Sequence, residues 1–233
     1  MITPGVPSWL PENLWSGLRF EDMETCARKW VEIIQRDEKP DVLVGLFHAG
    51  PESNKLDGII ENGSGEVARN VPGFDVIFMG HDHVKRCEKI VNAVGDSVLI
   101  IDPSNAARLV SDVTVRLKVK DGKITSKSLE GNLVDMTQYA VDEKFMEEFK
   151  SQYEATLQFV SRKIGSIDHT ISSKDAFFGP SAFIDLIHQL QLDITGADIS
   201  FCAPLSATAE IKEGDIYMSD MFNLYKFENL LYT

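Results

Sequence analysis

Two short stretches decide the fold of this 233-residue chain: VLVGLFHAG at residues 42–50 and DVIFMGHDH at residues 75–83. Each begins with an uninterrupted apolar run of strand length, which is typical of a strand covered on both faces. A long polar stretch with a turn at Asn62-Gly63-Ser64-Gly65 separates the two runs. Strand, crossover and strand together predict a parallel pair in an α/β fold.

The regions around this pair supply one helix and three more strands. Residues 21–37 are expected to form an amphipathic helix, residues 98–102 a third buried strand, and residues 109–119 and 123–129 a β-hairpin around a tight Asp-Gly turn. The predicted apolar stripe of the helix consists of Met23, Ala27, Trp30 and Ile34.

The later part of the chain predicts two more helices. Residues 141–164 carry apolar side chains at helical spacing and predict one helix of about six turns, at 3.6 residues per turn, which would bridge to a second unit. Residues 181–196 predict another helix, and residues 214–232 are expected to be strand and loop. The aromatic side chains of this region are expected to be core rather than a platform for stacking bases: Phe201, Tyr217, Phe222, Tyr225 and Phe227.

Composition excludes several classes of protein. The net charge of −13 argues against a broad nucleic-acid surface, and no apolar run approaches the roughly 18 residues that cross a bilayer. Three scattered cysteines predict neither a disulfide framework nor a zinc knuckle. The first residues lack the basic patch and apolar stretch of a secretory signal. The chain begins with a proline-rich segment and ends in an apolar stretch, which favours an internal piece of a longer protein over a C-terminal strand docked in a sheet.

Three of the five histidines follow the two apolar runs directly. His48 comes after the first run, and His81 and His83 come after the second. Because ligands collect beyond the carboxyl ends of strands in open α/β sheets, the three imidazoles are expected to face one crevice. Imidazole is a common ligand of zinc and similar metals, so the pattern predicts a metal site. His169 and His188 lack this context and are expected to be ordinary hydrogen-bonded residues.

Nearby carboxylates are candidates for the remaining ligands. Asp41 and Asp75 precede their strands and are expected at the opposite end of the sheet. Asp82 lies between two histidines and is expected to face away from them. Asp102, at the end of the third strand, is the one local carboxylate expected at the histidine edge, which leaves the ligand set incomplete for two metals.

These residues resemble a known family. VGLFHAG (44–50) resembles the strand-to-His-x-Gly block of calcineurin-like metallophosphoesterases, and MGHDH (79–83) resembles their Gly-His-x-His block. Residues 196–232 resemble the start of the C-terminal domain of 5′-nucleotidases and 2′,3′-cyclic-nucleotide phosphodiesterases. The resemblance covers nearly the whole chain.

The resemblance implies a phosphoester hydrolase with a four-layer αββα catalytic domain. Residues 1–140 would be the C-terminal part of that domain, residues 141–165 a bridging helix, and residues 166–233 the N-terminal part of an α+β substrate-binding domain. The implied substrate is a nucleotide or cyclic nucleotide rather than a nucleic-acid polymer. The implied compartment is the periplasm or the cell exterior, and no membrane span is expected.

The implied cofactor is a pair of divalent ions such as zinc, manganese or iron. His48 and His81 would ligate one ion and His83 the other. The family's upstream blocks (Asp-x-His, Gly-Asp and Gly-Asn-His-Asp/Glu) are absent, so the catalytic residues are expected upstream of Met1, and the isolated chain is expected to have little activity. Residues 206–209 lack the arginine of the family's Gly-Gly-x-Arg segment, which favours the cyclic phosphodiesterase side.

Two alternatives remain open at this point. The three histidines would also suit a hydrolase with a single zinc ion and an open water position. The chain would equally suit a non-catalytic binding module that keeps the fold without the metals.

Overall fold

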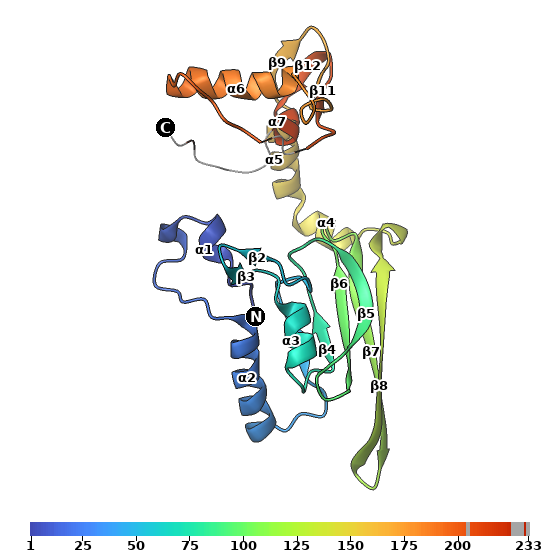
Figure 1. Cartoon of the computed structure of the whole chain (residues 1–233). Helices are drawn as coiled ribbons and strands as arrows, with labels where there is room; N and C mark the ends of the chain where they lie inside the picture. Colours follow the sequence, from blue (N-terminus) through green and yellow to red (C-terminus); the bar gives the residue numbers. More distant parts are fainter. Residues whose placement is uncertain (204–205, 225–230, 232–233) are drawn as a thin grey trace. The chain divides into compact units, whose positions relative to one another are not determined.

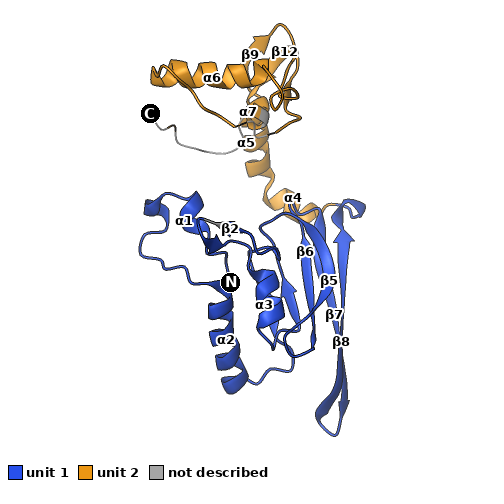
Figure 2. Ribbon diagram, viewed as in Figure 1, with its two compact units in different colours: residues 1–140 blue, residues 141–233 orange. Residues whose placement is uncertain are grey.

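The computed structural model of the protein describes residues 1–203, 206–224 and 231. The chain divides into two compact units, Met1–Ala140 and Val141–Thr233 (Figure 2). In the part of the chain that the structure describes, no helix is both long enough and apolar enough to cross a bilayer. The cysteines Cys26, Cys87 and Cys202 are free thiols.

A four-stranded sheet in the order β1-β4-β6-β5 forms the centre of the first unit (Figure 1). Strands β1 (Val44–Leu46), β4 (Val76–Phe78) and β6 (Ser97–Pro103) are parallel, and β5 (Lys85–Val91) runs antiparallel to β6. The predicted parallel pair and third strand are therefore confirmed. The sequence analysis missed β5, because its exposed residues KRCEKIV carry no apolar run.

Helices α2 (Met23–Asp37) and α3 (Ser64–Asn70) cover one face of this sheet (Figure 1). The register sets Gly45, Ile77 and Ile100 side by side on that face. The two isoleucines are fully buried, and they share one core with the buried faces of both helices. The larger members of this core are Met23, Val31, Leu43, Phe47, Val67, Val71, Phe74, Ile77, Met79, Val98 and Ile100.

The buried stripe of α2 differs from the prediction at one position. Met23 and Ala27 are buried as expected, whereas Trp30 is 52% exposed and Val31 takes the inner position. Trp30 and Val31 lie about 100° apart around the helix, on either side of Met23 and Ala27, so the buried arc is centred nearer to Val31 than predicted. The narrow space beside Gly73 accommodates the smaller Val31 side chain, because a Cβ at Gly73 would lie 2.9 Å from Val31.

A long hairpin covers part of the other face. Strands β7 (Leu109–Lys120) and β8 (Lys123–Asp135) extend beyond the predicted hairpin and are followed by a short 3-10 helix, η2 (Met136–Gln138). The apolar side chains of the β7–β8 hairpin pack on this face of the sheet. The sheet residues that they contact are Val76, Phe78, Leu99 and Ile101. The Nζ atom of Lys127 lies 2.5 Å from Oδ1 of Asp75 and donates to the carbonyl of Asp41 at 2.9 Å.

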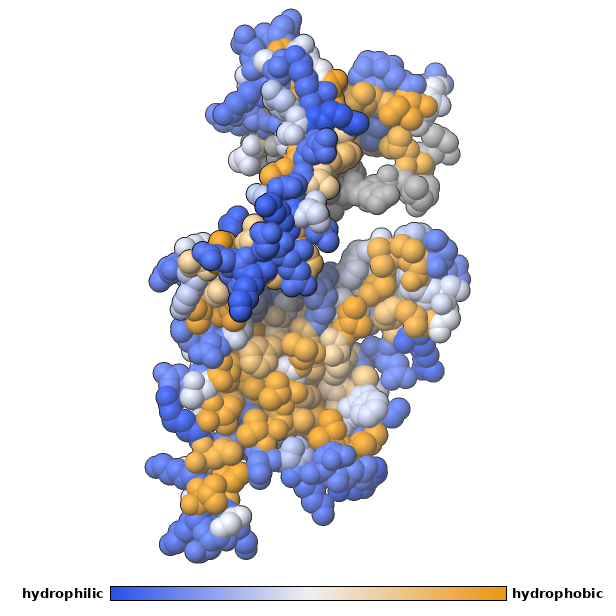
Figure 3. Space-filling view, turned by 180° about the vertical axis from the view of Figure 1, so that it is seen from behind, coloured by the Kyte–Doolittle hydropathy of each residue, from blue (hydrophilic) through white to orange (hydrophobic). Residues whose placement is uncertain are grey.

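The hairpin leaves the β1 side of this face open. Val44 and Leu46 lie in register with Val76 and Phe78 but are 50% and 75% exposed. The expectation that both faces of this strand are covered is therefore wrong for the described residues, and apolar side chains gather over this unit in Figure 3. Of the expected four αββα layers, the described residues form a helical layer, a mixed sheet and a hairpin layer.

Short elements surround the carboxyl edge of the sheet. Helix α1 (Val6–Trp9), the 3-10 helix η1 (Glu12–Leu14) and the two-stranded hairpin of β2 (Lys55–Leu56) and β3 (Ile59–Ile60) contribute to this region. A parallel bridge joins Ile2 to His48, so the first residues lie along the chain that follows β1.

The second unit consists of helices and two small sheets. The pairs are β9 (Lys163–Ile167) with β12 (Gly214–Tyr217) and β10 (Ile171–Ser172) with β11 (Glu210–Ile211). The helices are α4 (Glu143–Glu148), α5 (Lys150–Val160), α6 (Ala182–Thr195) and α7 (Met218–Leu224). Helix α6 confirms the predicted helix, and it ends at Gly196 in the left-handed region with φ 68°.

Three predictions for this unit are wrong. The expected continuous helix is interrupted at Phe149, and its last residues form β9 instead; no residue of α4 or α5 is buried. Residues 218–224 form a helix where strand and loop were expected. The aromatic side chains expected in the core are exposed at Phe201 (88%), Tyr217 and Phe222, while Tyr225 and Phe227 lie outside the described residues.

The first unit should not tolerate a side chain at Gly65. A Cβ there would collide with the backbone carbonyl oxygen of Pro51, which cannot swing away as a side chain can. We expect Gly65→Ala to lower the free energy of unfolding by about 1–3 kcal/mol, the usual cost of overpacking, measured by urea unfolding. Gly179→Ala is the control, because nothing lies within 4 Å of its Cβ position. Equal stability of the two variants would contradict the close packing.

Candidate functional site

The carboxyl ends of the parallel strands bring histidines together. His48 follows β1, and His81 follows β4 after Gly80. The ring centroids of His48 and His81 are 5.1 Å apart, and a Cβ at Gly80 would lie 3.7 Å from Nδ1 of His48. The indole of Trp9 packs on the other side of His81 with ring centroids 4.9 Å apart. We call the edge formed by His48, His81, Asp82, His83 and Asp102 the histidine rim.

The environment of His48 favours its neutral form. Partial burial lowers the pKa of this imidazole, and repulsion from His81 and His83 lowers it further. Only the neutral imidazole has a free lone pair for a metal ion. The rim therefore favours the form of His48 that has a free lone pair.

His83 lies beside the His48–His81 pair and contacts the loop after β6. The hydroxyl of Ser104 donates to the His83 carbonyl at 2.6 Å, and Nδ2 of Asn105 lies 3.3 Å from Nδ1 of the His83 ring. Within residues 1–203, 206–224 and 231, no group of three or more His, Cys, Asp and Glu side chains lies close enough to hold a metal ion. The structure thus brings two of the three predicted ligands into ring contact, and the described residues do not gather all three around one point.

Two carboxylates complete the rim. The carboxylate of Asp82 packs against Gly50, two residues after His48, and its charge acts on Asp102. Asp102 is fully buried, and its Oδ1 accepts from the backbone N–H of Ser104 at 2.8 Å, whereas its Oδ2 has no hydrogen-bond partner. Burial raises the pKa of Asp102, and the hydrogen bond from the Ser104 N–H opposes this. The neighbouring Asp82 carboxylate raises the pKa further, against a smaller lowering effect of Arg86.

Other predicted positions are where the sequence analysis expected them. Asp75 lies at the opposite end of the sheet, where its Oδ2 accepts from the backbone N–H of Leu43 at 2.9 Å. His169 is exposed and contacts Asp168 at 2.6 Å, and Nδ1 of His188 lies 2.9 Å from the hydroxyl of Ser200. Both histidines are ordinary hydrogen-bonded residues, as expected.

The sequence analysis missed Glu61. Its Oε1 lies 2.9 Å from Nε2 of His81, and both side chains are largely buried. The two residues are separated by 20 positions and a helix, so no spacing in the sequence signals their contact. The Glu61 carboxylate therefore fixes the orientation of the His81 ring, which three imidazoles alone would not do.

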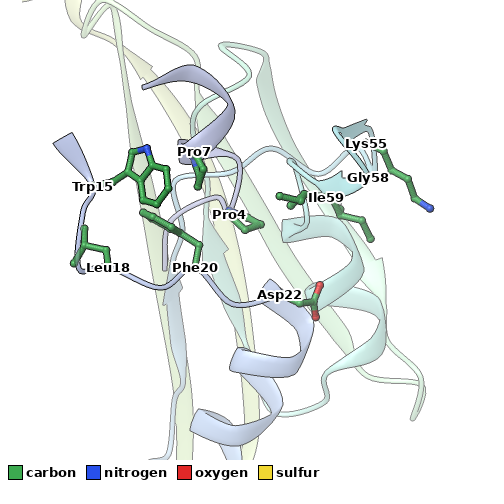
Figure 4. A pocket seen from close by; sticks show the side chains of 10 residues that line it. Pro4, Pro7, Trp15, Leu18, Phe20, Asp22, Lys55, Gly58 and Ile59 are labelled. Carbon is green, nitrogen blue, oxygen red and sulfur yellow. The ribbon is translucent and has the colours of Figure 1, made fainter. Parts of the chain in front are cut away.

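A cavity of about 470 Å³ lies in the same unit (Figure 4). Trp15, Leu18 and Phe20 line one side, and the β2–β3 hairpin with Lys55 and Ile59 lines the other. The rim histidines are not among its lining residues, although Ile60 at its wall directly precedes Glu61. The cavity is therefore distinct from the rim.

Solved structures share this architecture. The chain matches sulfate thiohydrolase SoxB of Thermus thermophilus with a TM-score of 0.60, at 19% identity, over 96% of this chain and 38% of that chain. It matches a 5′-nucleotidase precursor of the same organism with a TM-score of 0.58, at 19% identity, over 88% and 42% of the two chains. The protein is thus a mixed α/β chain with the fold of 5′-nucleotidases and metallophosphoesterases.

The comparisons of sequence lead to a narrower family. Residues 163–233 match the family model described as 5′-nucleotidase, C-terminal domain. A 2′,3′-cyclic-nucleotide 2′-phosphodiesterase/3′-nucleotidase of Haemophilus influenzae is 28% identical over 206 residues, covering 82% of this chain and 31% of the relative. The trifunctional nucleotide phosphoesterase protein YfkN of Bacillus subtilis is 20% identical over 263 residues, covering 98% of this chain and 18% of the relative.

The resemblance to the 5′-nucleotidase and 2′,3′-cyclic-nucleotide phosphodiesterase family is thereby confirmed, with calcineurin-like phosphoesterases among the structural neighbours. The chain spans less than a third of the length of either of these two relatives. The activities of these relatives are properties of the larger proteins.

The buried carboxyl group of Asp102 should make stability depend on pH in a defined direction. Because its folded-state pKa is raised, its contribution to stability is fully present below the unfolded-state pKa of about 3.9 and is lost as the pH rises through the folded pKa. Asp102→Asn keeps an acceptor for the Ser104 N–H and removes the buried charge. We expect the variant to gain stability relative to the wild type as the pH rises from about 4 to neutrality, measured by urea unfolding.

The matched control is Asp121→Asn at the exposed hairpin turn, which tests the general effect of this exchange. The prediction is wrong if the difference in free energy of unfolding between Asp102→Asn and wild type stays constant with pH, or grows in favour of the wild type.

Proposed function

We propose that this chain contributes histidine ligands to a divalent-metal centre in a phosphoesterase that hydrolyses nucleotides or 2′,3′-cyclic nucleotides. The observation that carries the proposal is the contact of the His48 and His81 rings, 5.1 Å apart, at the carboxyl edge of the parallel strands. In open α/β sheets this edge is where ligands bind. The family resemblance supplies the substrate class.

The residues of the rim fit a metal ion in part. Neutral imidazoles are suitable ligands, and the lowered pKa of His48 keeps its ring in that form. The buried Oδ2 of Asp102 is an acceptor that lacks a partner, as expected where a polar group awaits a ligand or water. The ligand set is short of the three or more side chains that a closed site needs.

This shortage bears on the alternatives. A single zinc ion held by His48, His81 and His83 requires the three rings around one point, and the described residues contain no such group. The division of His48 and His81 from His83 is instead compatible with the family's two ions, with His83 on the second. We therefore favour the two-metal phosphoesterase over the single-zinc hydrolase.

The parts of the chain have separate roles in this proposal. Residues 1–140 would be the C-terminal part of the catalytic domain, and residues 166–233 would be the N-terminal part of the substrate-binding domain, which is supported by the family match of residues 163–233. Residues 141–165 belong to the second compact unit and do not form one bridging helix. We also propose that the protein acts in the periplasm or outside the cell, which is the compartment implied by the family resemblance.

The reaction assigns limited tasks to the residues of this chain. A pair of divalent ions, when bound, supplies an activated water and neutralises charge on the phosphoryl oxygens. His48 and His81 offer uncharged nitrogen ligands, and Trp9 shields one face of the His81 ring from water. Asp102, with its raised pKa, holds a proton more firmly than an exposed carboxyl group does.

Metal binding should depend on the paired rings. We expect the chain to bind Zn²⁺ or Mn²⁺, and His48→Ala and His81→Ala each to weaken binding at least about tenfold, the lower limit for disturbing even an outer-shell partner. Isothermal titration calorimetry with the metal salts measures this. His169→Ala is the control, because that histidine is exposed and lies in the second unit. Affinity that is unchanged in both rim variants would remove the metal centre from this edge.

Nucleotide binding should require the metal. The chain carries a net charge of −13, which repels an anionic phosphate, and bound cations would offset that repulsion. We expect AMP or 2′,3′-cyclic AMP to bind in the presence of Mn²⁺ and not in the presence of chelator, measured by calorimetry. Equal binding under both conditions would contradict a metal-dependent phosphoesterase site.

A further inference from the structure

The His81 ring contacts the side chains of Glu61, Trp9 and His48. Its Oε1 lies 2.9 Å from Nε2 of His81, and the side chains of Glu61 and His81 are only 17% and 19% exposed. Trp9 packs on one side of the imidazole, and His48 lies on another. The ring of His81 is therefore fixed by one directional contact and two packing contacts.

The second oxygen of the Glu61 carboxylate is also engaged. Oε2 accepts from Nδ2 of Asn54 at 3.1 Å, and Oδ1 of Asn54 accepts from Nδ2 of Asn62 at 2.9 Å. Oδ1 of buried Asn62 in turn accepts from the backbone N–H of Gly50 at 2.6 Å. A chain of hydrogen bonds thus connects Glu61 to the segment that carries His48.

The backbone of Glu61 is also held by hydrogen bonds, to Thr3 and Asn54. Its carbonyl accepts from the hydroxyl of buried Thr3 at 2.6 Å, and its N–H donates to the carbonyl of Asn54 at 3.0 Å. The N–H of Thr3 donates to the carbonyl of His48 at 3.0 Å. Glu61 therefore cannot move far from His81 without breaking contacts on both its backbone and its side chain.

We propose that Glu61 is the positioning residue of the rim, which selects the tautomer of His81 and aims its other nitrogen at the metal. A carboxylate only accepts, so the contact at 2.9 Å places the ring proton on Nε2 and leaves the lone pair on Nδ1. Ligating histidines commonly donate their second N–H to a carboxylate, which fixes the ring and strengthens the ligand. The inference rests on the proposed function for the identity of the ligand on Nδ1.

Glu61→Gln separates orientation from packing, because it is nearly isosteric. Both oxygens of Glu61 accept hydrogen bonds, one from Asn54 and one from His81. Glutamine keeps one acceptor and replaces the other with a donor, so either the Asn54 contact is lost or the His81 ring must present an unprotonated Nε2. The substitution therefore either shifts the tautomer of His81 or breaks the Asn54 contact that holds the carboxylate, while the side-chain volume is preserved.

The decisive measurement is ¹⁵N NMR of His81 in the metal-free protein, at a pH about two units above the ordinary imidazole pKa of about 6.5. In the wild type we expect the proton on Nε2, and in Glu61→Gln a shift of population toward the Nδ1–H form. Glu52→Gln is the control, because the Glu52 side chain is exposed and forms an ion pair with Arg86 rather than a contact with His81. A wild-type ring protonated on Nδ1 would overturn the inference.

The same variants tested with Zn²⁺ or Mn²⁺ connect orientation to binding. We expect Glu61→Gln to lose about 10- to 100-fold in affinity, the usual effect of removing a carboxylate behind a ligating histidine, and Glu52→Gln to lose none. Wild type that binds no metal would defeat the proposed function, while the NMR result would still decide the tautomer. Normal metal affinity in Glu61→Gln would overturn the positioning role alone.

Discussion

The parallel pairing of β1, β4 and β6 is the constraint on which the rest of this protein depends. Parallel strands end at the same edge of a sheet, so the residues that follow them meet although 33 positions separate His48 from His81. The pairing is stabilised by one continuous apolar layer, in which Ile77 and Ile100 are fully buried between the sheet and α2 and α3. A slip of one residue would turn these side chains to the other face and scatter the rim.

Two rim histidines have strained backbones. His81 and His83 have φ angles of 84° and 60°, a region that non-glycine residues adopt at a cost of about 1–3 kcal/mol each. Local hydrogen bonds offset part of this cost: the N–H of Val84 donates to Asp82, and the hydroxyl of Ser104 donates to the carbonyl of His83. The two strained positions turn successive histidines in different directions, which explains why His81 contacts His48 while His83 contacts Asn105.

The sequence was informative where burial is continuous and weak where contacts are distant. Apolar runs predicted the parallel strands, and the glycine after α6 predicted the end of that helix, because both signals are local. The signals failed for β5, whose polar residues are held by pairing with β6, and for the helix interrupted at Phe149, whose apolar stripe finds no buried partner among the described residues. Glu61 belongs to the same class, since only the fold brings it to His81.

The charge of the rim determines the order in which ligands can bind. Its described side chains are imidazoles and carboxylates, and the nearby Arg86 is already paired with Glu88 and Glu52 at 3.0 and 3.2 Å. Lowering the pKa of His48 removes a positive charge from the rim, which makes it a poorer site for a free anion and a better one for a cation. Under the proposed function, phosphate recognition at this edge would follow cation binding, because the described rim side chains are imidazoles and carboxylates rather than unpaired cations.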